Sequence, residues 1–234
     1  MSIPSAQIQT RLAYTFRNPA LLEQAITHTS YLQDHPEVTE SNQRLEFLGD
    51  AVIQLTLTHA LFELFPADRE GLLSKRRSAV TKGVFLARIA SDIGLDACLR
   101  LSASEEQGGG RTRASTLEDA FEALMGAVYL DSDFLTAKRV ILGLYGSIPD
   151  RLASLEEKEN PKGRLQEYAQ PLHGNAAIRY EVVAIRGEDH AKEFEMAVYL
   201  LDRQLGTGVG SSKKTAEETA ARAALALLAS EGRL

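Results

Sequence analysis

The chain has 234 residues, a formal net charge of −6 and one cysteine, so it has no internal disulfide and no overall basic character that would by itself indicate a nucleic-acid partner. Its 44% hydrophobic and 25% charged residues are ordinary for a globular protein of one or two domains. The longest apolar run, 223–229, is far too short to span a membrane, and residues 1–11 lack the apolar core of a signal peptide. We therefore expect a cytoplasmic protein without a membrane partner, in which Cys98 is buried.

The first two thirds of the chain predict a series of helices. Residues 5–65 carry short amphipathic segments, and a long helix from Gln43 is expected to end before Pro66, which cannot continue it. A further helix is expected over 70–90. Its basic run at 74–78 is either a solvated face or a strip that contacts phosphate.

The long helix carries an acidic pair. Side chains three and four residues apart share one stripe of a helix, and this stripe begins with Gln43, Glu46 and Asp50. It then continues into the apolar Ile53 and Leu57. Carboxylates one turn apart repel each other, and the repulsion grows where water is excluded. An acidic pair is most often solvated surface, but one that leads into a buried stripe requires a counter-charge.

A second acidic pair follows further along the chain. A flexible basic loop is expected over 107–113, and the pattern from Ser115 to Glu118 fits a capping box at a helix start. We assign Glu118 to that cap and leave it out of the candidate site. In the helix that follows, Asp119 and Glu122 lie on one face.

If these two helices pack together, four carboxylates meet. Gly126 continues the acidic face of the second helix, where it costs about 1 kcal/mol relative to alanine, and it therefore predicts close packing of another helix. Oxygen ligands suit Mg²⁺ or Mn²⁺, and the sequence has no Cys/His cluster with zinc spacing. Two such ions can activate a water and stabilise the leaving oxygen of a phosphodiester. The residues thus favour a phosphoryl-transfer site over a purely structural helical scaffold.

The sequence of residues 42–52, NQRLEFLGDAV, resembles the signature of ribonuclease III. The resemblance extends in the family's order to residues 27–31, 70–74 and 119–131, and it covers 5–150. It implies an endonuclease that hydrolyses double-stranded RNA with Mg²⁺, or Mn²⁺ in its place, and acts as a homodimer. The implied products have 5′-phosphate and 3′-hydroxyl ends with a short 3′ overhang, and the implied role is RNA processing, including maturation of rRNA precursors.

The resemblance also implies roles for individual residues. Asp50 and Glu122 are the implied catalytic residues. Phe47 is expected to pack across the two-fold interface, and Glu70 lies at the edge of the active-site valley. Gln43 stands where the family usually has Glu, so we place it beside the metals rather than among their ligands, because its amide carries no charge. The implied metal ligands are Glu46, Asp50, Asp119 and Glu122.

Gln43 leaves an alternative open. One acidic group near the metals is lost, so the chain could be a double-stranded-RNA-binding protein with an attenuated nuclease site.

The sequence pattern changes after a charged linker at 154–160. Residues 1–153 form the expected all-α endonuclease domain, and 161–234 read as a small α+β domain of order α-β-β-β-α. The expected elements of the second domain are a helix at 163–170, strands at 178–182, 193–200 and 204–209, and a helix at 212–229.

The second domain resembles a double-stranded-RNA-binding domain through residues 161–168 and 208–217, although Gly163 and Val209 depart from its usual residues. Such domains recognise the shape of A-form RNA through 2′-hydroxyls and phosphates. Residues 161–234 carry 10 basic and 10 acidic residues, so binding must come from local groups, such as two lysines at a helix N-terminus, which favours phosphate. The implied RNA-binding residues are Gln166, Glu167, Gln170, His190, Lys213 and Lys214.

Overall fold

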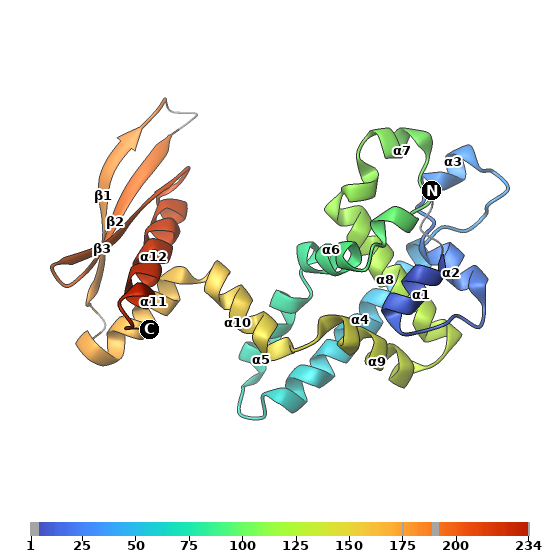
Figure 1. Ribbon diagram of the computed structural model, residues 1–234, viewed down its shortest axis with the longest axis horizontal. Coiled ribbons are helices and arrows are strands. Elements are labelled where there is room, and N and C mark those ends of the chain that lie inside the picture. Colours follow the sequence, from blue (N-terminus) through green and yellow to red (C-terminus); the bar gives the residue numbers. More distant parts are fainter. Residues whose placement is uncertain (1–4, 175, 189–191, 234) are drawn as a thin grey trace. The chain divides into compact units, whose positions relative to one another are not determined.

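The computed structural model describes residues 5–174, 176–188 and 192–233. The chain divides into two compact units, Met1–Pro149 and Asp150–Leu234. The first unit is helical, and the second contains a three-stranded antiparallel sheet with helices (Figure 1). The predicted fold class, an all-α domain followed by an α-β-β-β-α domain, is therefore confirmed.

The helices of the first unit follow one another through short connections. Within the described residues they are α1 (Ser5–Leu12), α2 (Pro19–Ala25), α3 (Tyr31–Asp34), α4 (Gln43–Leu64), α5 (Glu70–Val80), α6 (Gly83–Asp92), α7 (Ala103–Gln107), α8 (Ala114–Asp131) and α9 (Phe134–Tyr145), with short 3₁₀ turns η1 (Asp96–Cys98) and η2 (Gly110–Thr112). The long helix α4 ends before Pro66, as predicted, and Cys98 is buried.

The single helix predicted over 70–90 is wrong, because the segment is divided between α5 and α6. Both the backbone amide and the hydroxyl of Thr81 donate to the carbonyl of Arg77, which closes the last turn of α5. The chain then begins α6 at Gly83. The helical pattern of the sequence continues across the two residues between α5 and α6, so the pattern does not reveal that one helix ends there.

The glycine-rich basic segment 107–113, which was predicted as a flexible loop, is held by ion pairs. It contains the end of α7 and the turn η2, and its two arginines make ion pairs across it. Arg111 pairs with Glu106, and Arg113 pairs with Glu105. These contacts order the segment and neutralise its positive charge.

Helix α8 is the centre of the first unit and packs against α4, α6, α2 and α9. The capping box predicted at its start is wrong, since α8 begins at Ala114 and Arg113 makes no side-chain cap. Glu118 is therefore inside the helix, without the capping role assigned to it. At the other end Asp131 accepts hydrogen bonds from the Tyr14 hydroxyl at 2.6 Å and from the Arg17 amide at 2.7 Å, which ties the segment after α1 to α8.

Two glycines let α4 and α8 cross at backbone contact. A Cβ added to Gly49 would lie 1.7 Å from the carbonyl oxygen of Glu122, and one added to Gly126 would lie 2.3 Å from that of Leu45. Both distances are far below van der Waals contact, so neither position accepts a side chain without moving a helix. The close packing predicted from Gly126 is confirmed, and Gly49 supplies its other half.

The second unit has the predicted order of elements. Helix α10 (Ile148–Glu159) spans most of the predicted linker, so that stretch is helical. The domain boundaries at 153 and 161 stay predictions. The sheet pairs its three strands in the order β1-β2-β3. The elements that follow α10 are α11 (Pro161–His173), β1 (Ile178–Arg186), β2 (Glu193–Leu200), β3 (Arg203–Gly210) and α12 (Lys213–Ser230).

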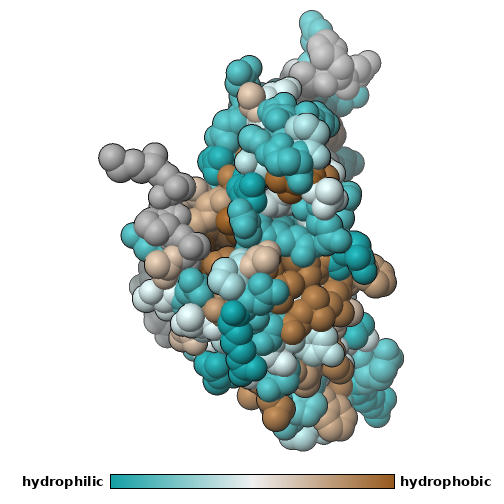
Figure 2. Space-filling model, turned by 90° about the vertical axis from the view of Figure 1, so that its right-hand side faces the viewer, coloured by the Kyte–Doolittle hydropathy of each residue, from teal (hydrophilic) through white to brown (hydrophobic). Residues whose placement is uncertain are grey.

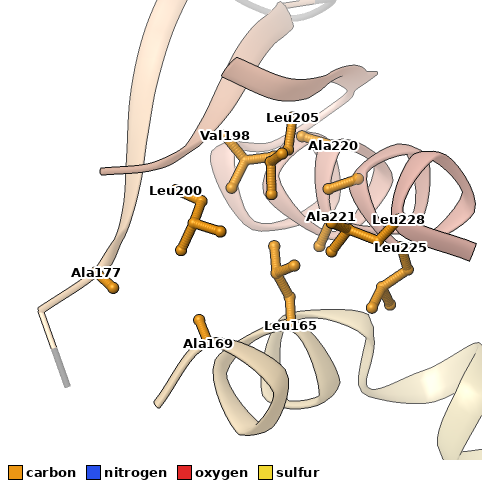
Figure 3. Close-up of a cluster of buried hydrophobic side chains, with 11 residues drawn as sticks. Leu165, Ala169, Ala177, Val198, Leu200, Leu205, Ala220, Ala221, Leu225 and Leu228 are labelled. Carbon is orange, nitrogen blue, oxygen red and sulfur yellow. The ribbon is translucent and has the colours of Figure 1, made fainter. Parts of the chain in front are cut away.

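Alternate glycines on β3 face an alanine stripe on α12. A Cβ on Gly208 would lie 2.2 Å from the amide nitrogen of Ala220, and one on Gly210 would lie 2.6 Å from that of Ala216. This strand therefore lies directly against the helix backbone. The core beside it joins α11, β2, β3 and α12, with Leu165 of α11 pointing toward the leucines of α12 (Figure 3).

The crossing of α4 and α8 gives a stability prediction with a matched control. Gly126→Ala places a methyl group against the Leu45 carbonyl and should lower the free energy of unfolding by about 1–3 kcal/mol. Gly143→Ala, in α9 with open space around it, should raise that free energy by up to about 1 kcal/mol. Urea unfolding of both variants measures the difference, and equal changes in the two would contradict a tight crossing.

Candidate functional site

The crossing of α4 and α8 brings the predicted carboxylates together. Gly49, which contacts the backbone of Glu122, lies between Glu46 and Asp50 on α4. Asp119 lies one turn before Glu122 on α8. The pairs Leu45–Gly126 and Gly49–Glu122 run in opposite directions along the two helices, so the acidic part of α4 faces the acidic part of α8.

The carboxylates share one electrostatic environment. Burial, followed by the charges of Asp50, Glu118, Glu46 and Asp119, raises the pKa of Glu122 to about 8, and the Glu122 side chain is only 9% exposed. The pKa of Glu46 is also raised, first by burial and then by Asp119, Glu118 and Asp50. These groups are therefore close enough to repel one another in partly excluded water.

The cluster lacks a basic partner in the described part of the chain. No lysine or arginine there contributes to the raised pKa values of Glu46, Asp119 and Glu122. His28 alone opposes the effect of burial, at Asp119. Half-buried oxygen ligands without a counter-charge match the charge and the hardness of a divalent cation such as Mg²⁺.

The side chains do not form a ready-made metal cage. Within residues 5–174, 176–188 and 192–233, no three carboxylate, imidazole or thiol groups lie close enough to hold one ion. Mg²⁺ keeps several waters and binds through one or two carboxylates together with substrate phosphates, so it does not require such a cage. The residues therefore fit a hydrated magnesium ion better than a closed structural metal site.

Gln43 lies at the start of α4 and Glu70 at the start of α5. Gln43 is exposed at the start of α4, where its side-chain oxygen accepts a hydrogen bond from Ser41 at 3.4 Å. Glu70 is exposed at the first residue of α5 and accepts a hydrogen bond from Ser74 at 3.1 Å. Their predicted positions beside the metals stay predictions.

An apolar strip runs along the exposed side of α4. Phe47 is 83% exposed, and Leu55 and Phe62, which follow at about two-turn intervals, are 56% and 69% exposed. Beside Phe62 a hollow of about 510 Å³ is lined by residues of α4, α5 and their connection, including Leu73 and Glu70. Figure 2 shows that hydrophobic residues also gather into a patch on one face of the first unit. Solvent-exposed apolar side chains in such a row are typical of a protein–protein contact.

The basic run on α5 is partly structural. Arg76 pairs with Asp68 at 2.7 Å and stacks on the ring of Phe65, with 4.2 Å between its guanidinium carbon and the ring centroid. Arg77 donates to the hydroxyl of Thr58 at 3.2 Å. Both arginines therefore hold α5 to the end of α4, and Lys75 is the exposed member of the run.

The predicted RNA-binding residues lie on the two helices of the second unit. Glu167 and Gln170 are exposed on α11, and Gln166 is half-buried. Lys213 and Lys214 are exposed in the first turn of α12, whose N-terminus is capped by the Ser212 hydroxyl accepting from Thr215 at 3.2 Å. His190 lies outside the described residues.

An ion pair fixes these two helices relative to each other. Lys162 of α11 pairs with Glu217 of α12, and its ammonium group lies 4.8 Å from the centre of the Tyr180 ring on β1. The contact connects the segment that carries Gln166 with the turn that carries Lys213. It gives the predicted binding groups a fixed spacing.

Two side chains near the carboxylates were not predicted to belong to the site. Glu118 lies four residues before Glu122 on the same helix face, and this spacing was the signal that could have identified it. His28 accepts a hydrogen bond at Nδ1 from the amide of Ser30 at 3.2 Å. Nothing in its sequence neighbourhood indicates its proximity to Asp119.

The described residues include no helix that is both long and apolar enough to cross a membrane.

Comparisons with known proteins match both units of the chain. Residues 18–147 match the family described as Ribonuclease-III-like, and residues 161–228 match the double-stranded RNA binding motif. The chain is 42% identical over 233 residues to a protein named Ribonuclease 3 from Pseudomonas putida (strain W619), covering 99% of this chain and 98% of the relative. It is 44% identical over 223 residues to Ribonuclease 3 from Carboxydothermus hydrogenoformans, covering 94% of each.

Solved structures give the same result for the first unit. The nuclease domain of ribonuclease III from Campylobacter jejuni aligns with a TM-score of 0.57 at 35% identity, covering 68% of this chain and 97% of that one. A second structure of that domain, described by flexibility in a region involved in dimer formation, aligns with a TM-score of 0.56 at 39% identity, covering 59% of this chain and 93% of that one.

The raised pKa of Glu122 predicts a pH dependence of stability in the metal-free protein. Between the ordinary value of 4.5 and about 8, the folded state keeps a proton that the unfolded state has lost. The free energy of unfolding should therefore fall as the pH rises through this range, by at most about 1.4 kcal/mol per pH unit from this group. Urea unfolding of wild type and Glu122→Gln in the presence of a chelator measures it. Parallel pH profiles for the two proteins would show that Glu122 titrates normally.

Proposed function

The chain belongs to the ribonuclease III family, and on that premise we propose that it cleaves double-stranded RNA through a Mg²⁺ site at the crossing of α4 and α8. The observation that carries the proposal is that Glu46, Asp119 and Glu122, which are partly or fully buried, have no described lysine or arginine partner, and that the exposed Asp50 lies beside them. The expected products carry 5′-phosphate and 3′-hydroxyl ends with a short 3′ overhang. The expected role is RNA processing in the cytoplasm, with rRNA precursors among the substrates.

The carboxylates would hold the metal, and the helix crossing would fix their positions. Bound divalent metal, Mg²⁺ or Mn²⁺, supplies Lewis-acid chemistry at a phosphodiester. Glu46, Asp50, Asp119 and Glu122 would hold it, with Asp50 and Glu122 as the catalytic pair. The tight helix crossing fixes the backbones that carry these carboxylates, so little ordering is needed when substrate binds. No side-chain nucleophile is required.

The second unit would hold the RNA duplex. Lys213 and Lys214 make no ion pair within the described residues and stand at a helix N-terminus, where backbone amides add to their attraction for phosphate. Gln166, Glu167 and Gln170 would face the minor groove from α11, and His190 would do so from the loop that joins the first two strands. Phosphate contacts of this kind make affinity strongly salt-dependent.

A homodimer is the expected assembly. The exposed strip of Phe47, Leu55 and Phe62 would be covered by a second copy of the chain, related by a two-fold axis. Burial of such a strip removes a large apolar surface from water, which is the main driving force for association.

A second candidate function rests on Gln43. Its neutral amide leaves the start of α4 with one carboxylate fewer than the family usually has, which favours a protein that binds duplex RNA but cleaves it poorly. The following experiment separates the two candidates.

Binding and cleavage should be separable by substitution in the two units. We expect Asp50→Asn and Glu122→Gln to bind a long RNA duplex as wild type does but to cleave it at least about 100-fold more slowly. Lys213→Ala with Lys214→Ala should do the opposite, with weaker binding, a salt slope reduced by about 2, and cleavage retained at low salt. Gel-shift titration and single-turnover cleavage measure the two properties.

Two results would contradict the proposal. Wild-type cleavage rates in both carboxylate variants would remove the site from α4 and α8. If wild type binds duplex RNA but cuts at no Mg²⁺ or Mn²⁺ concentration, while Gln43→Glu does cut, the binding-only candidate is correct.

The dimer can be tested at Phe47. Loss of a large apolar side chain from a packed interface costs about 2 kcal/mol, and a two-fold axis buries it twice, so Phe47→Ala should raise the dimer dissociation constant roughly a thousandfold. Leu135→Ala is the control, because Leu135 is also exposed but lies on α9, outside the strip. Sedimentation over a range of concentrations measures both, and a monomeric wild type at micromolar concentration would refute the dimer.

A further inference from the structure

Glu118 occupies a space that only a glycine leaves open. A Cβ on Gly83, the first residue of α6, would lie 2.0 Å from one carboxylate oxygen of Glu118 and 2.4 Å from the other. The carboxylate therefore rests directly on the backbone at the start of α6. Any larger residue at position 83 would displace it.

This carboxylate has no role at the start of its own helix. Helix α8 begins at Ala114, so Glu118 lies inside the helix, in its second turn, and is not a cap partner of Ser115. It is half-buried. Its position four residues before Glu122 puts both side chains on one face of α8.

The backbone of α8 contacts α4 at Glu122 and Gly126. Leu45 of α4 contacts Gly126 of α8. Gly49, one turn later on α4, contacts Glu122, one turn earlier on α8. One further turn along α8 from Glu122 reaches Glu118. In agreement with this geometry, burial raises the pKa of Glu122, and the charges of Asp50 and Glu118 add to that effect.

We propose that Glu118 is a fifth carboxylate of the site, and that its charge strengthens divalent-cation binding between α4 and α8. The proposal rests on the proposed function, since it concerns the same site. Glu118 would act from the side of the site next to α6. The start of α4, where Gln43 carries no charge, would lie on the opposite side. The chain would thus keep a strongly negative site although one acidic group is absent from α4.

The test measures Mn²⁺ binding to the full-length protein without RNA, by the loss of the free Mn²⁺ signal in electron paramagnetic resonance. Glu118→Gln should raise the dissociation constant about 10-fold, the size typical for a changed group beside a metal site. Glu118→Asp, which keeps the charge, should recover part of that loss. Asp92→Asn, at the opposite end of α6, removes an equal charge and should leave the constant unchanged.

Gly83→Ala tests whether the position of the Glu118 carboxylate matters apart from its charge. It keeps Glu118 but pushes its carboxylate out of the space beside α6, so it should also weaken Mn²⁺ binding. Chelator-treated Glu118→Gln should unfold in urea at no lower concentration than wild type, because it loses a repelling charge and keeps a hydrogen-bond acceptor.

The outcomes distinguish this proposal from the function on which it rests. If wild type binds Mn²⁺ and Glu118→Gln binds it equally well, Glu118 is not part of the site and the four predicted carboxylates remain. If Asp92→Asn weakens binding as much as Glu118→Gln, only overall charge matters and the proposal is wrong. If wild type binds no Mn²⁺, both the fifth carboxylate and the proposed metal site are refuted.

Discussion

The backbone contact between α4 and α8 is the constraint on which the first unit depends. Gly49 and Gly126 remove the side chains that normally keep two helices apart, so each helix touches a carbonyl of the other. Helix axes usually stay 8–10 Å apart because side chains separate them. Here the missing side chains bring the acidic turns of both helices to one place, and the surrounding helices complete the packing around α8.

That arrangement has an electrostatic cost. Carboxylates forced together in partly excluded water hold protons more tightly, as the raised pKa of Glu122 shows. Most proteins relieve such a cluster with arginine or lysine. In this unit arginines pair instead with acidic side chains outside the cluster, as Arg76 does with Asp68 and Arg111 with Glu106. A hydrated divalent cation is the counter-charge that suits the remaining carboxylates.

The second unit uses the same packing device for a different purpose. Glycines on β3 let the alanine face of α12 lie against the strand, so a thin layer of small residues holds the helix in place. The lysines in the first turn of α12 are then presented on a rigid element. Because this unit has no excess of positive charge, the placement of these few groups matters more for RNA binding than total charge.

The sequence by itself determined the type of several long elements, because periodicity, prolines and glycines act over one or two turns, but it did not reveal that the predicted linker is part of helix α10. It identified α4 from Gln43 to its end before Pro66, the three strands, and the four carboxylates at i, i+3 and i+4 spacing. Only the tertiary structure decided which groups face one another. It divided the helix expected over 70–90 and moved the start of α8 to Ala114. It also placed Glu118 against Gly83, a residue 35 positions away. Local pattern encodes which face of a helix is polar, whereas the crossing of two helices decides what that face meets.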